Sequence, residues 1–140
     1  MVMRQLLGTT LLAMTLLAGC GDDRAAEVSP PAEVDPVTLV SGTAGRGAEA
    51  THATDVSEDA ALATYVEQFD DPFAAKVSAA AGRIDVGSGQ VLLAQVVAIG
   101  CDAPTSAHVR GHVIVPAKVA SPLQECFAPV TTVALAVVPD

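Results

Sequence analysis

Tryptophan is absent from this chain of 140 residues, and its only aromatic residues are one tyrosine and three phenylalanines. Basic residues are also scarce, since seven lysines and arginines stand against sixteen acidic residues and leave a net charge of −9 at pH 7. Proteins that bind nucleic acid need basic groups for the phosphates, and those that bind single strands also need aromatic rings for stacking. The composition therefore predicts no nucleic-acid partner.

Long apolar runs are missing as well. The longest mostly apolar stretch, residues 6–17, is about a dozen residues long, whereas a helix that spans a bilayer needs about 20. It follows the basic residue Arg4 and matches the apolar part of a signal peptide, so we expect the chain to be exported. Hydrophobic residues still make up 51% of the chain, which excludes a disordered polyampholyte and suits one folded domain.

The apolar stretch ends in Leu17-Ala18-Gly19-Cys20. This order resembles the lipobox of bacterial lipoproteins, a resemblance that covers residues 1–20 only. It implies that the signal peptide, residues 1–19, is removed and that the sulfur of Cys20 carries diacylglycerol, which anchors the protein at the extracytoplasmic face of the cell membrane. The alternative is an ordinary secretory signal that leaves Cys20 as a free thiol, which is unfavourable in an oxidising compartment.

The mature chain would keep six basic and sixteen acidic residues, a net charge of −10. Anionic headgroups repel such a chain, so the lipid rather than a basic patch is expected to hold it to the membrane.

Residues 20–54 are predicted to be the lipidated cysteine followed by a flexible tether rich in proline, glycine and alanine. Gly42, Gly45 and Gly47 do not have the spacing of a phosphate-binding loop or of a dinucleotide-binding fold, and the flanking strand and helix patterns are missing. Residues 37–40 are an exception within the tether, because this β-prone tetrapeptide could form a first edge strand.

Residues 55–140 are predicted to form a small α+β domain, in which two N-terminal helices pack on an antiparallel sheet of three or four strands. Apolar residues spaced by three and four indicate the helices, with Asp71-Pro72 as a helix start and Gly82 as a stop. The expected helices are residues 57–69 and 71–82, and the expected strands are 91–99, 112–119 and 130–138.

Two of these strands indicate how the layers pack. Residues 91–99 are almost entirely apolar, which is typical of a central strand covered on both faces. In the last strand, Val133, Leu135 and Val137 make a bulky face and the residues between them a small one. We expect a helix to lie on the small face, where it can approach closely.

Cys101 and Cys126 are the pair that remains if Cys20 carries lipid. An even pair in an exported chain predicts a disulfide. Because Cys101 follows the expected central strand and Cys126 precedes the last one, the bridge would hold these two strands adjacent and antiparallel.

No arrangement of residues points to catalysis or to a bound cofactor. His108 and His112 have a spacing that binds metal on a helix, but they lie among β-formers, and neither a single strand nor a hairpin would bring the imidazoles together. The carboxylate pairs Glu58-Asp59 and Asp70-Asp71 stand where helices are expected to start, and negative charge stabilises a helix there. The sequence therefore predicts no metal site, no cofactor and no enzyme.

Gln95 and Phe127 are the candidate binding residues. Gln95 is either a hydrogen-bonded amide of the core or a specificity group in an apolar pocket. Phe127 either fills the core or projects from a loop that is braced by Cys126 and Pro129, as in the rigid reactive loops of small exported protease inhibitors. We therefore expect a membrane-anchored, non-catalytic module that binds a protein or a small apolar partner, with a protease inhibitor as the alternative.

Overall fold

The computed structural model describes residues 37–140. The predicted signal peptide, Cys20 and the first part of the predicted tether lie outside these residues. Six strands and two helices follow one another along the described part of the chain: β1 (Thr38–Thr43), β2 (Thr54–Asp55), α1 (Asp59–Val66), α2 (Asp71–Ala81), β3 (Gln90–Gly100), β4 (Ala107–Arg110), β5 (Val113–Pro116) and β6 (Val130–Pro139). Neither helix has the length and apolar content that crossing a membrane would require.

Four strands form an antiparallel sheet in the order β1-β6-β3-β2, and β4 and β5 form a separate hairpin. β3 and β6 are the central pair, with Gln90 opposite Pro139 and Gly100 opposite Val130. The predicted adjacency of these two strands is therefore confirmed. β1 and β2 are the edges of the sheet.

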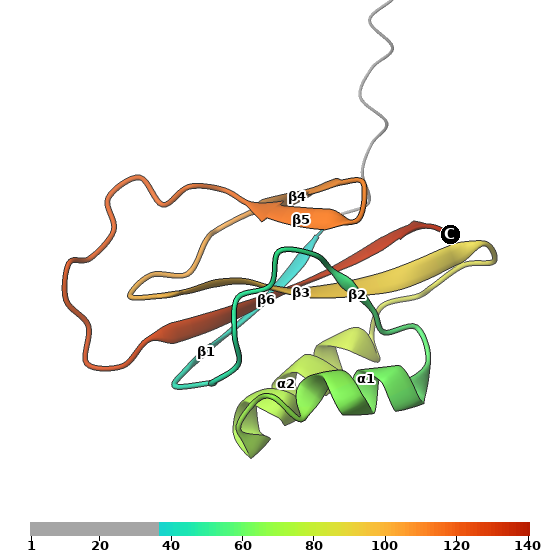
Figure 1. Ribbon diagram of the computed structural model, residues 1–140, viewed down its shortest axis with the longest axis horizontal. Helices are drawn as coiled ribbons and strands as arrows, with labels where there is room; N and C mark the ends of the chain where they lie inside the picture. Colours follow the sequence, from blue (N-terminus) through green and yellow to red (C-terminus); the bar gives the residue numbers. More distant parts are fainter. Residues whose placement is uncertain (1–36) are drawn as a thin grey trace, which may run out of the picture. The chain divides into compact units, whose positions relative to one another are not determined.

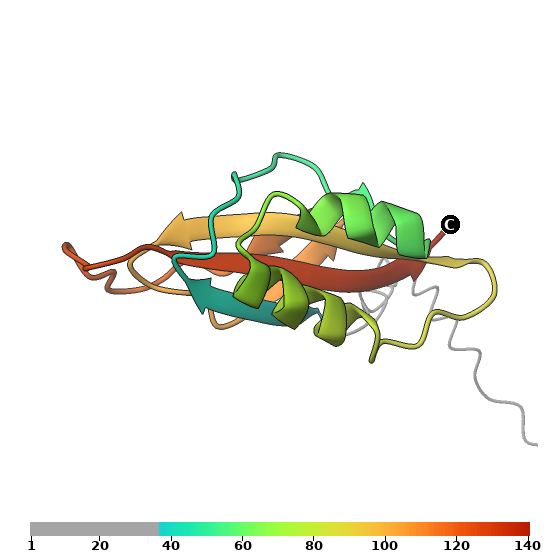
Figure 2. The same cartoon turned by 90° about the horizontal axis from the view of Figure 1, so that it is seen from below.

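The two faces of the four-stranded sheet are covered by different layers (Figure 1). Both helices lie across one face, as the view from their side shows (Figure 2), and the β4–β5 hairpin lies over the other. The bulky residues Val133 and Leu135 of β6 face the helices, whereas Ala134 and Ala136 face the hairpin and contact Ile114.

The expectation that a helix lies on the small face of the last strand is thus wrong. α2 is itself rich in alanine, so bulky strand residues fill the space in front of it. The branched side chain of Ile114 from the hairpin instead needs the room that the alanines leave.

The fold is mainly β, with six strands in two antiparallel sheets and two helices that follow β1 and β2. The predicted α+β fold, with two N-terminal helices on one sheet, is therefore wrong. Residues 38–43 form β1, so the folded region begins before the predicted boundary at Asp55.

The hairpin cannot join the sheet beside β3, because the N–H groups of Ala50 and Val56 already donate to β3 carbonyls at that edge.

The helices themselves are close to the prediction. α1 is shorter than expected at both ends, and α2 is capped by Asp70 rather than Asp71, with a side-chain oxygen that accepts a hydrogen bond from the Phe73 N–H. Gly82 ends α2 as predicted. The two carboxylate pairs lie at the helix starts, where the sequence had placed them.

Three aromatic rings form the centre of the helix-side core. Tyr65 meets Phe69 edge to face with ring centroids 5.7 Å apart, and Phe69 meets Phe73 with centroids 5.1 Å apart. Gly42 and Gly45 lie directly against the Phe73 ring, so close that any side chain at either position would clash with it. These glycines, which matched no phosphate-binding loop, serve to seat an aromatic ring.

The hydroxyl of Tyr65 is buried and has no hydrogen-bond partner among the described residues. Burial also raises the pKa of this phenol above its usual value. Because the ring packing is kept when the hydroxyl is removed, Tyr65→Phe is expected to raise the free energy of unfolding at pH 7 by about 1 kcal/mol. Urea unfolding of both proteins would measure the difference, and a variant that is less stable would contradict the prediction.

The raised pKa of Tyr65 also predicts that the free energy of unfolding falls in alkali. The unfolded chain can ionise Tyr65 from about pH 10, whereas the folded protein holds the phenol neutral. The ionisation therefore leaves the free energy of unfolding unchanged below about pH 10 and lowers it progressively above that pH, and the Tyr65→Phe variant should be spared this loss. Since the chain has one tyrosine, ultraviolet absorbance reports its ionisation directly.

Candidate functional site

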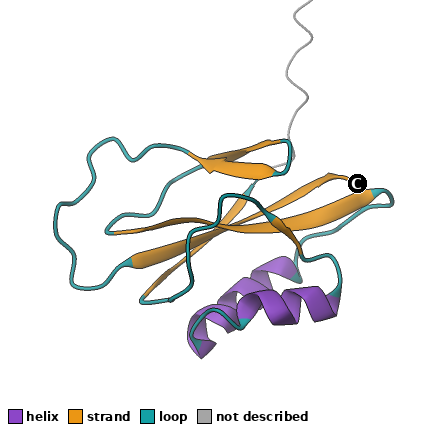
Figure 3. Cartoon of the chain, viewed as in Figure 1, coloured by secondary structure: helices purple, strands orange, loops and turns teal. Residues whose placement is uncertain are grey.

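The longest connection between described elements joins β5 to β6 and comprises residues 117–129, hereafter the β5–β6 loop (Figure 3). It contains no helix or strand. Two of the three large apolar residues that the described part of the chain exposes, Leu123 and Phe127, lie on this loop, and the third is Val86. Such residues are natural contact points for a partner.

The β5–β6 loop is held at several points along its length. Cys101, directly after β3, forms the predicted disulfide with Cys126, and the two Cα atoms are 5.2 Å apart. A side-chain oxygen of Asp102 accepts a hydrogen bond from the Leu123 N–H. At the far end, the carbonyl of Pro129 accepts a hydrogen bond from the Ala44 N–H, 2.8 Å away. The loop is thereby fixed to the end of the central strand pair.

Phe127 projects fully into solvent, with a relative exposure of 114%. The interpretation that it fills the core is therefore wrong, and the reason is local. Cys126 and Pro129 fix the backbone on either side of it, and the central core is already filled by the other three aromatic rings. Leu123, exposed to 61%, was not singled out from the sequence, although the preceding Pro122 was a signal for a turn beside an apolar residue.

Gln95 lies on β3 facing the hairpin and is 4% exposed. Its side-chain oxygen accepts a hydrogen bond from the Ile114 N–H, and its side-chain nitrogen donates to the carbonyl of Ala50, each over 2.8 Å. The amide therefore joins β3, the segment that leads into β2, and β5. Gln95 takes the structural role that the sequence left open, because both ends of its amide are hydrogen-bonded to backbone groups.

The Gln95→Leu variant is expected to lower the free energy of unfolding by about 1–3 kcal/mol. Leucine has a similar volume, but it leaves the buried Ile114 N–H without an acceptor. Gln124→Leu is the matched control because Gln124 is exposed, and it should change stability by less than about 0.5 kcal/mol. If chemical denaturation shows equal effects of the two substitutions, the hydrogen bonds of the Gln95 side chain do not stabilise the fold.

The two histidines lie on a hairpin, one of the two geometries considered from the sequence. His108 is exposed on β4 opposite Val115, and His112 forms the two-residue turn together with Gly111, whose φ of +62° suits a tight hairpin turn. Within residues 37–140, no group of three or more histidine, cysteine or acidic side chains could hold a metal ion. Two histidines at this spacing can bind one metal ion on a helix, and the hairpin turn at Gly111 means that the segment is not helical.

The comparisons with known proteins add no family. No protein-family model matches the chain, and no curated protein or solved structure matches it significantly. The β5–β6 loop offers an aromatic ring, an aliphatic side chain, the exposed carboxylate of Glu125 and a disulfide, and the exposed groups among them can contact a partner.

Proposed function

We propose that this protein is an exported lipoprotein anchored at the extracytoplasmic face of the cell membrane, whose folded part is a non-catalytic module that binds a protein partner through the β5–β6 loop. The observation that carries the binding role is Phe127, which is fully exposed on a loop fixed by the Cys101–Cys126 disulfide. Fixing the loop before contact lowers the entropy lost on binding. An aromatic ring that enters an apolar pocket is a common energetic centre of protein interfaces.

The anchorage rests on Leu17-Ala18-Gly19-Cys20 and is supported by a disulfide of the kind found in exported proteins. Cys20→Ser removes the sulfur to which diacylglycerol would be attached. We expect this variant to leave the membrane fraction or to remain unprocessed, whereas the wild type partitions with membranes and carries a lipid-modified N-terminal peptide. Correct cleavage and unchanged membrane partitioning of Cys20→Ser would contradict the lipid assignment.

Site-specific photo-crosslinking in intact cells tests the contact residue. A benzophenone amino acid placed at Phe127 is expected to give a discrete adduct with one protein of the cell envelope. The same group at Val86, exposed in the connection between α2 and β3, is the control and should not give that adduct. Phe127→Ala should also weaken binding of the crosslinked protein at least tenfold. Identical adduct patterns at both positions would contradict a contact role for the loop.

A protease inhibitor is the second candidate, because an exposed phenylalanine beside a disulfide resembles the reactive loops of such proteins. The inhibitor would present Phe127 to the specificity pocket of a chymotrypsin-like peptidase. The backbone bends at Phe127 and Ala128, whereas a substrate-like loop is extended, so the binding module is favoured.

Titration of a chymotrypsin-like peptidase with the full-length protein distinguishes the two. Stoichiometric inhibition that Phe127→Ala abolishes would favour the inhibitor. Cleavage after Phe127 without inhibition, or no effect at all, would exclude it.

A further inference from the structure

The β4–β5 hairpin lies over the four-stranded sheet and has a second face that points away from it (Figure 1). Val109 of β4 and Ile114 of β5 pack toward the four-stranded sheet. Because side chains alternate along a strand, their neighbours point the other way. The residues of this outward face, hereafter the outer hairpin face, are His108, Arg110, Val113 and Val115, and the register pairs His108 with Val115 and Arg110 with Val113.

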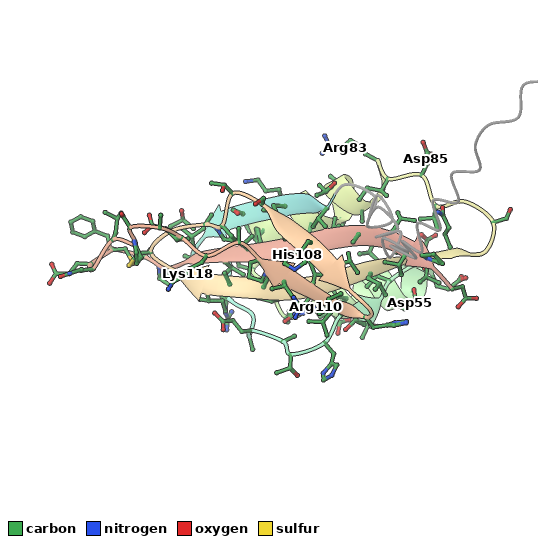
Figure 4. All side chains as sticks on the ribbon, turned by 90° about the horizontal axis from the view of Figure 1, so that it is seen from above. Asp55, Arg83, Asp85, His108, Arg110 and Lys118 are labelled. Atoms are coloured by element: carbon green, nitrogen blue, oxygen red, sulfur yellow. A yellow bond between two sulfur atoms is a disulfide. The ribbon has the colours of Figure 1, made fainter. Side chains whose placement is uncertain are left out.

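The charge of this layer is opposite to that of the chain as a whole. No acidic residue occurs between Asp102 and Glu125, whereas Arg110 and Lys118 lie in that stretch. Figure 4 looks onto the outer hairpin face and shows His108 and Arg110 on it, Lys118 in the segment after β5, and Asp55 toward one end of the hairpin. The carboxylate of Asp55 is engaged by the N–H and hydroxyl of Ser57. A protein with a net charge of −9 thus carries one locally basic face.

The chain also joins the fold on this side. Val37, the first described residue, and Leu39 pack into the cluster that lies between the four-stranded sheet and the hairpin. Residues 21–36, which separate Val37 from Cys20, are sixteen residues, and a chain of that length reaches at most about 58 Å even when fully extended. A lipid on Cys20 would therefore keep the hairpin layer within reach of the membrane surface.

We propose that the outer hairpin face docks on anionic phospholipid headgroups of the membrane in which the Cys20 lipid is inserted. The proposal rests on the proposed lipid anchorage. Arg110 and Lys118 would contact phosphates, and Val113 and Val115 would lie at the headgroup boundary between them. Each cation near an anionic surface raises the equilibrium constant for membrane binding about fivefold, and two cations are too few to hold a free protein there. Tethering makes the contact intramolecular, with an effective concentration in the millimolar range, so a weak attraction is sufficient.

Docking would also orient the protein. The helices would face away from the membrane, and the acidic residues at the starts of α1 and α2 would be kept from the headgroups. The expectation that a chain of this net charge is simply repelled holds for the average charge and not for this face.

The absence of tryptophan makes the test direct, because one introduced tryptophan is a unique reporter. The full-length mature lipoprotein is reconstituted into vesicles of phosphatidylcholine alone or with 30% phosphatidylglycerol, each containing brominated lipid as a quencher. Val113→Trp reports on the outer hairpin face, and Ala79→Trp, at an exposed position of α2, reports on the opposite layer. We expect at least twofold stronger quenching of the Val113→Trp reporter in the anionic vesicles only.

Charge reversal supplies the matched control. Arg110→Glu removes one attraction and adds one repulsion, so it should lower the ratio of docked to undocked protein about 25-fold. Arg83→Glu makes the same change at another exposed arginine, after α2, and should leave the quenching unchanged. Unchanged melting temperatures confirm that both variants fold.

The outcomes separate the two proposals. Protein that partitions into vesicles but is quenched equally at both reporter positions would overturn the docking face and leave the anchorage standing. Equal quenching in neutral and anionic vesicles would also overturn it, because the attraction would not be electrostatic. Protein that does not partition into any vesicle would contradict the anchorage and, with it, the docking that rests on it.

Discussion

Replacement of Phe73 with alanine is expected to lower the free energy of unfolding by about 3–5 kcal/mol. The ring is 4% exposed, meets Phe69 edge to face and lies against the backbone of Gly42 and Gly45. Truncation leaves a cavity that neither glycine can fill, because neither has a side chain. Chemical denaturation measures the loss, and Leu123→Ala, which truncates an exposed apolar residue, should cost less than about 0.5 kcal/mol.

A double-mutant cycle tests the specific contact between ring and glycine. Gly45→Val places a side chain where the Phe73 ring lies and should destabilise the wild type, whereas in the Phe73→Ala background the valine can enter the vacated space. We expect a coupling free energy of about 1–3 kcal/mol between the two substitutions. Additive effects would show that the glycines do not seat the ring.

Removal of the disulfide by Cys101→Ser combined with Cys126→Ser is expected to lower the free energy of unfolding by about 3.5 kcal/mol. The bridge closes a loop with a sequence separation of 25, so without it the unfolded chain gains conformational freedom. The closed segment contains the whole β4–β5 hairpin and most of the β5–β6 loop. Unfolding of the wild type with and without reductant gives an independent measurement.

The double serine variant should also separate stability from binding. If the bridge serves mainly to fix Phe127 before contact, the variant binds the crosslinked partner more weakly even at temperatures where it is fully folded. A variant that matches the stability of the oxidised wild type would contradict the role of the bridge in the fold.

Local patterns along the chain predicted both helices and the strands β3, β5 and β6, but not β2 and β4, and long-range pairing was harder to predict. The spacing of Phe73, Val77 and Ala81 follows the buried face of α2, and helix starts and stops depend on neighbouring residues. β1 is instead specified by its partner: Ser41 bonds to Thr132, which is 91 positions away. The six residues of β1 do not indicate that contact, so the sequence alone could not decide between a strand and the tether.

Long-range contacts also decide which of the two candidate binding residues is exposed. The cysteine pair could be assigned because its chemistry restricts its partners, and the position of the bridge then followed from the strands it joins. The direction of a side chain on an irregular loop depends on contacts from elsewhere. For Phe127 these are Cys101, two strands earlier, and Ala44 in the turn after β1. The sequence could therefore name Phe127 and Gln95 but not say which of them is exposed.

The position of β6 has a consequence for biosynthesis. This strand is made after all other described elements, yet it lies between β1 and β3 and is the partner of both. Until β6 leaves the ribosome, β1 has no partner in the sheet and β3 has one open edge. The sheet cannot close before β6 has been synthesised, so a chain that is exported, as proposed above, would until then keep a form that can be threaded through a membrane. Ribosome stalling before residue 130 should therefore yield nascent chains that proteases degrade readily.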